Sequence, residues 1–364
     1  MQVTADSGSR SLETRMLSTN SRAFLHQLGT TLAAAYGSLS NPRCRQAISV
    51  LADSIDGELR EMIAPPTTDG GVCLIRGILI DERSIGRTPP IWAAIDDTTS
   101  LPVDLQMLLL ACMIGRPFGW RGQQEGRLVN NVMPARGHEK VQTGASSSIL
   151  LSPHTEDSFH PHRSHVFLLG CVRNRDAVAT TVASIRDVRL SATDREILSR
   201  PNVPILPDLT YGDPARWGSA EAVPTLWERA DGLCLRYDPD YTPLAEADAE
   251  FRAAYRRLGT ELERVTRRVV LEPGDVAIID NDVVVHGRVP FTARFDGTDR
   301  WLKRVNIAIP RRARPLAESN ENGYGQQVDY LTREPIPDPR ATPRHRGETP
   351  AGKPERHGAT ASRH

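Results

Sequence analysis

Hydrophobic residues follow two different periods along this chain. From about residue 20 to 62 they recur every three or four positions, which predicts helices. The apolar segment 100–120 predicts a core helix that begins at a Ser100 cap close to a proline. After Trp120, short apolar runs alternate with Gly and Pro turns, which is typical of strands. The expected strands lie within residues 71–80, 126–134, 164–172, 177–185, 232–238, 267–273, 275–280, 283–289 and 300–310.

These patterns predict a mainly β fold with flanking helices. Many short strands favour a β-sandwich or barrel-like core, and helical segments interrupt it near residues 187–199 and 243–266. We expect one domain over residues 19–333, helical up to about residue 118. Residues 1–18 are polar, and residues 334–364 are rich in Pro, Arg and Gly. Such segments bury too little surface to offset chain entropy, so we expect both to be disordered.

Charge and cysteine content exclude several classes of protein. Lys plus Arg and Asp plus Glu both total 45, so there is no excess positive charge for a nucleic-acid or anionic-membrane surface. The longest apolar run, residues 105–114, is too short to cross a bilayer, and the N terminus lacks the apolar segment of a signal peptide. The five scattered cysteines favour free thiols in a reducing compartment. We therefore expect a cytoplasmic protein with neither nucleic acid nor membrane as its partner.

The stretch SPHTEDSFHPHRSH, residues 152–165, concentrates groups that bind divalent metals. On an extended segment, His154 and Glu156 point to the same side and can reach one ion together. His286 follows a strong apolar strand and is the best third ligand. Two histidines and a carboxylate form the triad that leaves open positions on Fe(II). The tripeptide alone is a weak signal, because surface loops also collect such residues by chance.

The other polar groups of this stretch have different expected roles. Asp157 would diverge from His154 on a strand, so we expect it not to replace Glu156 as a ligand. The other three histidines lie in an expected loop, and we expect none of them to bind the metal. They are His160, His162 and His165.

An arginine completes the candidate site. Arg300 lies fourteen residues after His286, on an expected strand. A fixed guanidinium there could bind a carboxylate through two parallel hydrogen bonds. Metal, open positions and an arginine are what 2-oxoglutarate requires. A zinc hydrolase built on the same triad would have no use for this arginine, and no general base is evident beside the ligands.

Four motifs carry a resemblance to a known family: HTEDSFHP, RNRDAVATTVASI, DNDVVVHGRVPF and ARFDGTDRWLKRVN. Together they resemble the clavaminate synthase-like (TauD-type) branch of Fe(II)/2-oxoglutarate-dependent oxygenases. Within it the chain is most similar to the arginine β-hydroxylases of peptide-antibiotic pathways, of the viomycin type. The resemblance extends from about Ile75 to Ile309. It implies a distorted double-stranded β-helix (jelly roll) core, Fe(II), and 2-oxoglutarate and O2 as co-substrates.

The resemblance also assigns residues to iron and to 2-oxoglutarate. His154, Glu156 and His286 correspond to the iron ligands. Arg300, assisted by Thr181, corresponds to the group that holds the distal carboxylate of 2-oxoglutarate.

A second set of residues corresponds to the substrate site, which in this family is covered by a lid, here around residues 205–245. Arg304 would hold the substrate α-carboxylate and Gln123 the α-amine. Asp238 and Asp240 lie in LRYDPDY, and such a pair of acids suits a guanidinium. Asp208 corresponds to a further acid of the lid.

The implied function is hydroxylation of free L-arginine at C3 or C4, with release of succinate and CO2, in specialised amino-acid or antibiotic biosynthesis. Desaturation of arginine is an alternative, as is a related guanidine amino acid such as enduracididine. Two departures keep these alternatives open: a glycine within TGASSS, residues 143–148, and a short segment between Asp208 and Leu233. The alternative outside enzymes is a catalytically silent jelly-roll protein that binds a ligand. No feature of the sequence predicts an oligomeric state.

Overall fold

The computed structural model describes residues 12–55, 57–212 and 220–331. Its α-helices are α1 (Thr19–Tyr36), α2 (Pro42–Ser54), α3 (Glu58–Met62), α4 (Glu82–Ile85), α5 (Asp97–Ile114), α6 (Ala192–Leu198) and α7 (Ala249–Val265). The strands are β1 (Glu13–Met16), β2 (Val72–Arg76), β3 (Arg116–Trp120), β4 (Asn130–Val132), β5 (Leu151–His154), β6 (Val166–Arg173), β7 (Thr180–Ser184), β8 (Leu226–Arg229), β9 (Gly232–Leu235), β10 (Arg267–Val269), β11 (Val276–Asp280), β12 (Val284–Arg288), β13 (Trp301–Ala308) and β14 (Val328–Tyr330).

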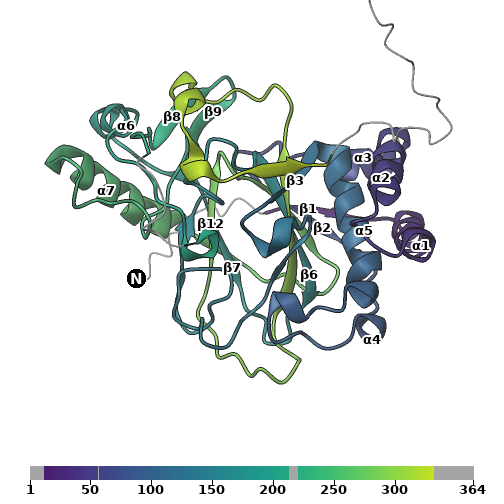
Figure 1. Ribbon diagram of the computed structural model, residues 1–364. Helices are drawn as coiled ribbons and strands as arrows, with labels where there is room; N and C mark the ends of the chain where they lie inside the picture. The colour runs from purple at the N-terminus through teal and green to yellow at the C-terminus, as the bar shows by residue number, and fades with distance from the viewer. Residues whose placement is uncertain (1–11, 56, 213–219, 332–364) are drawn as a thin grey trace, which may run out of the picture.

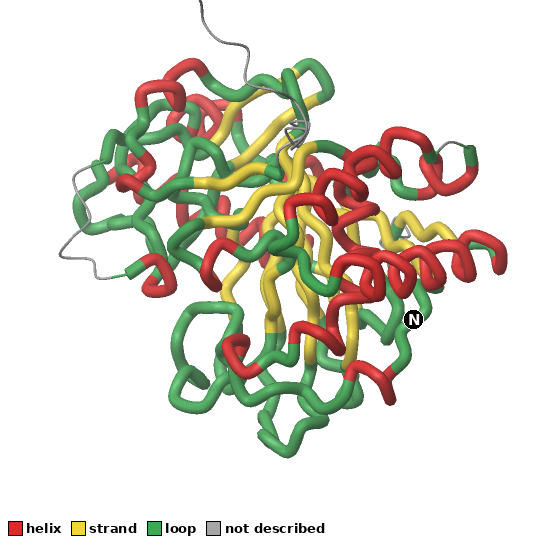
Figure 2. The backbone as a smooth tube through the Cα atoms, turned by 45° about the vertical axis from the view of Figure 1, so that its right-hand side comes forward, coloured by secondary structure: helices red, strands yellow, loops and turns green. Residues whose placement is uncertain are grey.

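Two sheets organise these strands. The larger has the order β1-β2-β11-β6-β13-β3-β14, with β4 also paired to β13. The smaller has the order β10-β7-β12-β5, and β8 and β9 form a separate hairpin. The strands run side by side through the middle of the molecule, with helices on both sides and long loops at one end (Figure 2). The fold is therefore a mixed one of sheets and helices, and every strand expected from the sequence has a counterpart in it.

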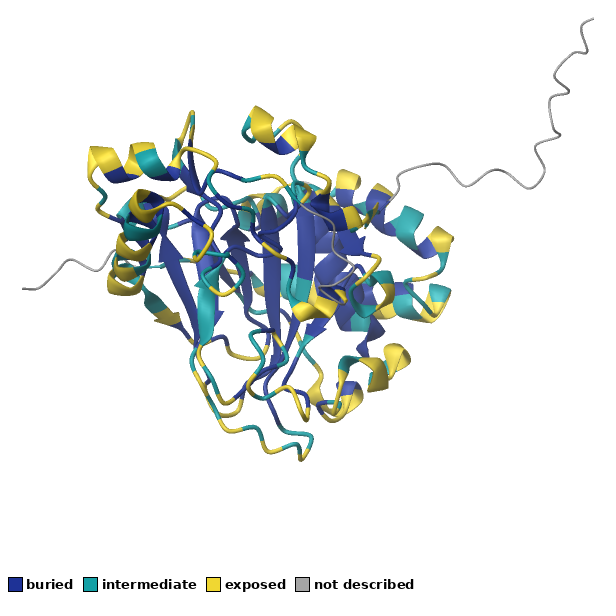
Figure 3. Ribbon diagram, turned by 60° about the vertical axis from the view of Figure 1, so that its left-hand side comes forward, coloured by how far each residue is buried: buried dark blue, intermediate teal, exposed yellow. Residues whose placement is uncertain are grey.

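Helices cover the outer face of the large sheet. α1, α2 and α5 gather on the right of Figure 1, and a hydrophobic cluster joins them to β6 and β13 through residues such as Leu25, Leu108 and Val305. The opposite face of β6 carries Phe167, which packs with Val182 and Val284 of the small sheet. The strands are almost wholly buried, while exposed residues gather on the helices and loops (Figure 3). This packing places the edge strand β5 and its neighbour β12 across from the inner face of the large sheet.

Helix α5 differs from its prediction at both ends. Its N-cap is Asp96, whose side chain accepts a hydrogen bond from the Thr98 amide at 2.9 Å, so the helix begins one turn before the expected Ser100 cap. It ends at Ile114, and the RPFGW segment that we expected to continue the helix forms β3 instead. β3 pairs with β13, and this pairing decides its conformation over the local pattern.

The expected disorder of residues 1–18 is also wrong in part, because Glu13–Met16 forms β1, parallel to β2. The Arg15 guanidinium donates hydrogen bonds to the carbonyls of Met62 at 2.8 Å and Ala64 at 2.7 Å, and Leu17 is buried. These partners are distant in sequence, so composition did not reveal them. The expected disordered segments 1–11 and 334–364 lie outside the described residues.

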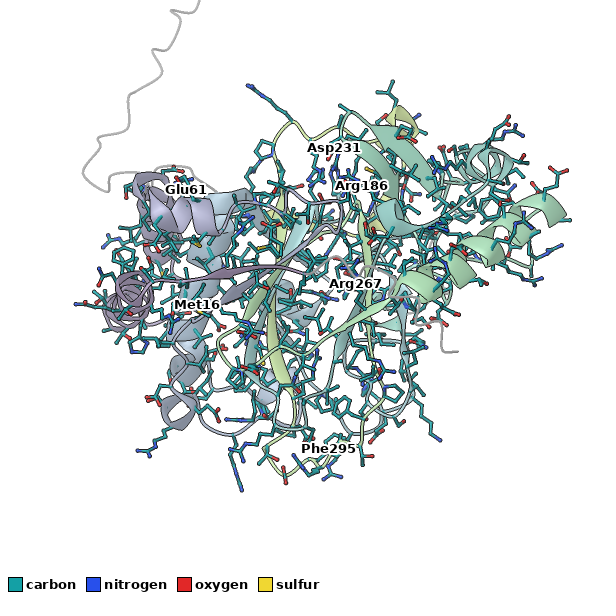
Figure 4. The ribbon with its side chains drawn as sticks, turned by 180° about the vertical axis from the view of Figure 1, so that it is seen from behind. Met16, Glu61, Arg186, Asp231, Arg267 and Phe295 are labelled. Carbon is teal, nitrogen blue, oxygen red and sulfur yellow. The ribbon has the colours of Figure 1, made fainter. Side chains whose placement is uncertain are left out.

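Three further features complete the fold. In the described ranges, no helix has the length and apolar character needed to span a membrane. All five cysteines are buried. Arg186, just after β7, lies beside Asp231 of the β8–β9 turn, with 3.0 Å between nitrogen and oxygen, and both are labelled in Figure 4. This ion pair fixes the hairpin to the small sheet.

Candidate active site

A cross-strand pair of histidines begins the site. β5 and β12 are antiparallel, and His154 lies directly opposite His286 in their register. Their ring centroids are 4.4 Å apart. Paired side chains on adjacent strands share one face of the sheet, so both imidazoles point toward the same space. Because 131 residues lie between the two histidines, no local sequence pattern indicates this pairing.

Glu156 is turned into the same space by contacts of its backbone. The Glu156 amide donates to Asn281 Oδ1 at 2.8 Å, and Asn281 Nδ2 donates back to the Glu156 carbonyl at 3.0 Å. The Thr155 amide donates to the Tyr237 carbonyl at 2.7 Å. As a result, Glu156 Oε2 lies 3.3 Å from His286 Nε2. One potential ligand atom from each of His154, Glu156 and His286 lies within 4.8 Å of the other two.

The protonation of this triad suits a metal. His154 Nδ1 lies 2.8 Å from the Ser152 carbonyl and donates to it, which leaves Nε2 free as a ligand. Burial lowers the pKa of His154, so the imidazole is neutral near pH 7. Burial opposes ionisation of Glu156, but Arg304 and the two imidazoles outweigh it and hold its pKa below the usual range. Two imidazoles and a carboxylate fit Fe(II).

Arg300, at the start of β13, is a buried cation that lacks a carboxylate partner among the described residues. Its Nη2 donates to Thr180 Oγ1 at 2.8 Å, while its Nε has no hydrogen-bond partner in the described part of the chain. Burial lowers its pKa to about 10. A buried guanidinium with an unsatisfied N–H favours an anion as its partner, and the sequence predicts that this anion is the distal carboxylate of 2-oxoglutarate.

The threonine beside Arg300 is one residue away from the predicted one. Thr180 lines the cavity next to Arg300, whereas the predicted Thr181 follows it on β7 and points to the opposite face of the strand. A second buried arginine, Arg288, also lines this part of the cavity, and the sequence patterns did not identify it as a site residue. It donates to the Ser147 carbonyl at 3.0 Å, and burial lowers its pKa to about 10.

Arg304 and Gln123 lie together beside the triad. Arg304 is four residues after Arg300 on β13, and its Nη1 donates to Glu156 Oε1. Its Nη2 donates to Gln123 Oε1 at 2.7 Å. Both side chains line the cavity. We expected Arg304 to bind the substrate α-carboxylate and Gln123 the α-amine.

The three predicted acids line the same cavity but differ in how their oxygens are used. Asp238 is buried, and its carboxylate accepts from the amides of Asp240 at 3.1 Å and Tyr241 at 3.2 Å and from Ser158 Oγ at 3.3 Å. Burial raises the pKa of Asp238 to about 6. Asp240 is exposed toward the cavity mouth. Asp208 caps a short 3-10 turn, Leu209–Tyr211, and burial raises its pKa.

The cavity that joins these groups has a volume of about 460 Å³. This lies within the usual range for small-molecule sites, roughly 300–1,000 Å³. The metal triad, the Arg300 group, the Arg304–Gln123 pair and the three acids all contribute to its wall. The structure thus brings together every residue predicted for the site except Thr181.

The other polar residues of the 152–165 stretch have partners outside the triad. His160 Nε2 lies 3.1 Å from the Gln326 carbonyl, and His165 Nδ1 accepts from the Ile309 amide at 3.0 Å. The Asp157 carboxylate accepts from Trp120 Nε1 at 2.7 Å, from Asn306 Nδ2 at 3.3 Å and from the Tyr211 hydroxyl. None of these belongs to the metal-binding group found among the described residues.

Comparison with known proteins decides the family. The model of the taurine catabolism dioxygenase TauD, TfdA family matches residues 111–306, which is more than half of the chain and includes all three ligands of the triad. The chain belongs to the TauD, TfdA family. It is therefore a non-haem Fe(II)- and 2-oxoglutarate-dependent dioxygenase, with O2 as the second co-substrate, as the sequence predicted.

Two similar relatives are amino-acid hydroxylases. The enduracididine beta-hydroxylase of Streptomyces hygroscopicus is 34% identical over 330 residues, which cover 82% of this chain and 94% of that protein. The L-ornithine/L-arginine 3-hydroxylase of Catenulispora acidiphila is 33% identical over 310 residues, which cover 76% and 88%.

A solved structure is also similar. The non-heme iron oxygenase OrfP in complex with Fe, succinate and (3S)-hydroxy-L-Arg superposes with a TM-score of 0.73 and 35% identity, covering 81% of this chain and 94% of that one. The same protein has been solved with Fe and alpha-ketoglutaric acid, and there the TM-score is 0.71 at 36% identity.

Proposed function

We propose that this dioxygenase hydroxylates free L-arginine at C3 or C4, with release of succinate and CO2. One observation carries the proposal: a single cavity contains the metal triad, the Arg304–Gln123 pair beside it and three carboxyl groups, of which Asp240 and Asp208 have oxygens left for a ligand. The relatives that act on arginine and enduracididine support the same substrate class.

The residues of the chain would hold the two ends of arginine. Arg304 would bind the α-carboxylate, since Arg304 and carboxylate form a charge-assisted pair, and Gln123 would accept a hydrogen bond from the α-amine through Oε1. Asp240 and Asp208, with Asp238 behind them, would bind the guanidinium. A fixed cation and fixed acids at opposite ends aim the middle carbons of the substrate at the metal.

Iron with 2-oxoglutarate and oxygen supplies the oxidising chemistry when bound. Arg300 and Thr180 would hold the distal carboxylate of 2-oxoglutarate away from solvent, in place of the predicted Arg300 and Thr181. The burial of this pair strengthens the attraction, because the charges interact in a medium of low polarity.

Enduracididine is the second candidate substrate, because a similar relative is an enduracididine beta-hydroxylase. Desaturation of arginine uses the same contacts and would differ only in the fate of the substrate after the first hydrogen is removed.

We also infer the finer architecture from this family. The two sheets would form a distorted double-stranded β-helix, with residues 19–333 as one domain and a lid around residues 205–245. We also propose a cytoplasmic location, since the five cysteines are scattered and buried. A small amino acid is the proposed partner, with no nucleic acid or membrane.

A substrate panel tests the proposal. Purified protein with Fe(II), 2-oxoglutarate and oxygen is offered L-arginine, L-enduracididine, L-ornithine and L-lysine in turn, and succinate is quantified. We expect L-arginine or L-enduracididine to stimulate succinate release most, and Asp240→Asn to remove this preference over L-lysine. Equal stimulation by all four amino acids, or by none, would overturn the guanidine assignment.

A further inference from the structure

The segment that carries Asp208 is held in place by a tyrosine that does not line the cavity. Asp208 caps the short turn Leu209–Tyr211: its side chain accepts from the Thr210 amide at 2.7 Å, and its carbonyl accepts from the Tyr211 amide at 3.1 Å. Asp208 and Tyr211 are therefore parts of one compact turn. A displacement of Tyr211 would displace Asp208.

Tyr211 has three kinds of contact on its far side. Its hydroxyl donates to Asp157 Oδ1, and its ring packs edge-on against Phe159 at 4.6 Å between centroids and Trp120 at 5.7 Å. Its carbonyl lies within reach of Gln326 Nε2 at 3.4 Å. The residue is buried, so these contacts are shielded from water.

Asp157 joins this turn to the catalytic strands. It follows the metal ligand Glu156 directly, and its backbone has a left-handed φ of 53°. Its other oxygen accepts from Trp120 Nε1 on β3 at 2.7 Å and from Asn306 Nδ2 on β13 at 3.3 Å. Asn306 is two residues after Arg304 on β13. The Asp157 carboxylate, next to Glu156 in the chain, is therefore hydrogen-bonded to the strand that carries Arg304 and to the turn that carries Asp208.

We propose that Tyr211 is a positioning residue that fixes the distance between Asp208 and the metal triad through its hydrogen bond to Asp157. This inference rests on the proposed function, because it concerns how the guanidinium end of the substrate is held. Without the Tyr211 hydroxyl, the Asp208 carboxylate can still bind a cation, but its position relative to the metal triad is no longer fixed. The substrate is then held less firmly, and its carbons are aimed less accurately at the metal.

The test compares Tyr211→Phe with Tyr330→Phe as a matched control. Tyr330 belongs to the same aromatic cluster, but it packs on Phe118 and beneath Arg116, away from Asp157. Calorimetry with Mn(II) in place of iron measures the Kd of L-arginine and of 2-oxoglutarate, and an aerobic assay with Fe(II) measures succinate formed per oxidised amino acid.

For Tyr211→Phe we expect the Kd of L-arginine to rise about tenfold, because the variant loses one hydrogen bond to a charged group. The Kd of 2-oxoglutarate stays unchanged, and succinate forms in excess of oxidised arginine. Tyr330→Phe leaves all three values unchanged. If Tyr211→Phe binds arginine as the wild type does and stays coupled, or if both variants change alike, the positioning role is overturned. If the wild type itself binds neither L-arginine nor L-enduracididine, the proposed function fails, and the role of Tyr211 fails with it.

Discussion

Replacing Arg300 by Met tests whether its guanidinium is built for an anionic co-substrate. In the protein alone this cation is buried with Thr180 Oγ1 as its hydrogen-bond acceptor at 2.8 Å, and its Nε is unsatisfied within the described residues. Removing it takes away an uncompensated buried charge, so the free energy of unfolding without ligand should stay level or rise. When 2-oxoglutarate is bound, Arg300 would form a buried charge pair with its distal carboxylate, and Arg300→Met removes one partner of that pair.

The expected loss of 2-oxoglutarate affinity can be worked out from the cost of removing one charge of this pair. Truncating one partner of a buried, hydrogen-bonded charge pair costs about 2–5 kcal/mol, which corresponds to a Kd for 2-oxoglutarate raised roughly 30-fold to several thousand-fold. In the wild type, 2-oxoglutarate at 100 times its Kd should stabilise the fold by about 2.7 kcal/mol. In Arg300→Met at the same concentration, most of this stabilisation should be lost.

Thermal unfolding with Mn(II) and increasing 2-oxoglutarate measures both effects, with Arg288→Met as the control. Arg288 is also a buried arginine of this cavity, but it donates to the Ser147 carbonyl at 3.0 Å and to Ser146 Oγ at 2.9 Å. Its removal should lower Tm without ligand, because those acceptors are left unsatisfied. If Arg300→Met binds 2-oxoglutarate as tightly as the wild type, or loses more stability than Arg288→Met, then Arg300 is not a binding residue for the co-substrate.

Three further predictions concern the metal loop and the acids. Asn281→Ala should weaken Mn(II) binding by about 10- to 100-fold in calorimetry, since Asn281 holds the Glu156 backbone; an unchanged Kd would contradict this. Asp240→Asn should raise the Kd of L-arginine about tenfold and leave that of 2-oxoglutarate alone, and equal effects on both would count against its place in the substrate site. Burial raises the pKa of Asp238 to about 6, so metal-free protein should lose affinity for L-arginine as the pH falls through 6 and this carboxylate is protonated. Asp238→Asn should abolish that pH step, and a step that persists in the variant would assign it to another group.

The candidate site was largely predictable because its chemistry lies in residue types. Imidazoles, a carboxylate and an arginine in this order indicate a metal and an anionic co-substrate whatever the surrounding fold. The structure brings His154, Glu156, His286 and Arg300 to one cavity. Residues that act through geometry alone were harder to find. Asn281 holds Glu156 across 125 positions of sequence, and no local pattern shows this contact.

Two errors show where sequence patterns lose information. Threonine was expected beside Arg300, but the choice between Thr180 and Thr181 depends on strand register, where a shift of one residue reverses the face. The strand β1 was expected to be disordered, and local composition could not show otherwise, because its parallel pairing with β2 depends on residues sixty positions later in the chain. In both, the deciding contact is with a distant segment.

Hydroxylation of L-arginine is tested most directly by an aerobic reaction with Fe(II), 2-oxoglutarate, L-arginine and isotopically labelled O2, followed by mass spectrometry of both products. We expect one labelled oxygen atom to enter the amino acid and one to enter succinate, in equal amounts. Arginine that loses two hydrogens without gaining oxygen would assign desaturation to the same site. Arginine that stays unchanged, with succinate no more abundant than in its absence, would show that L-arginine is not the substrate.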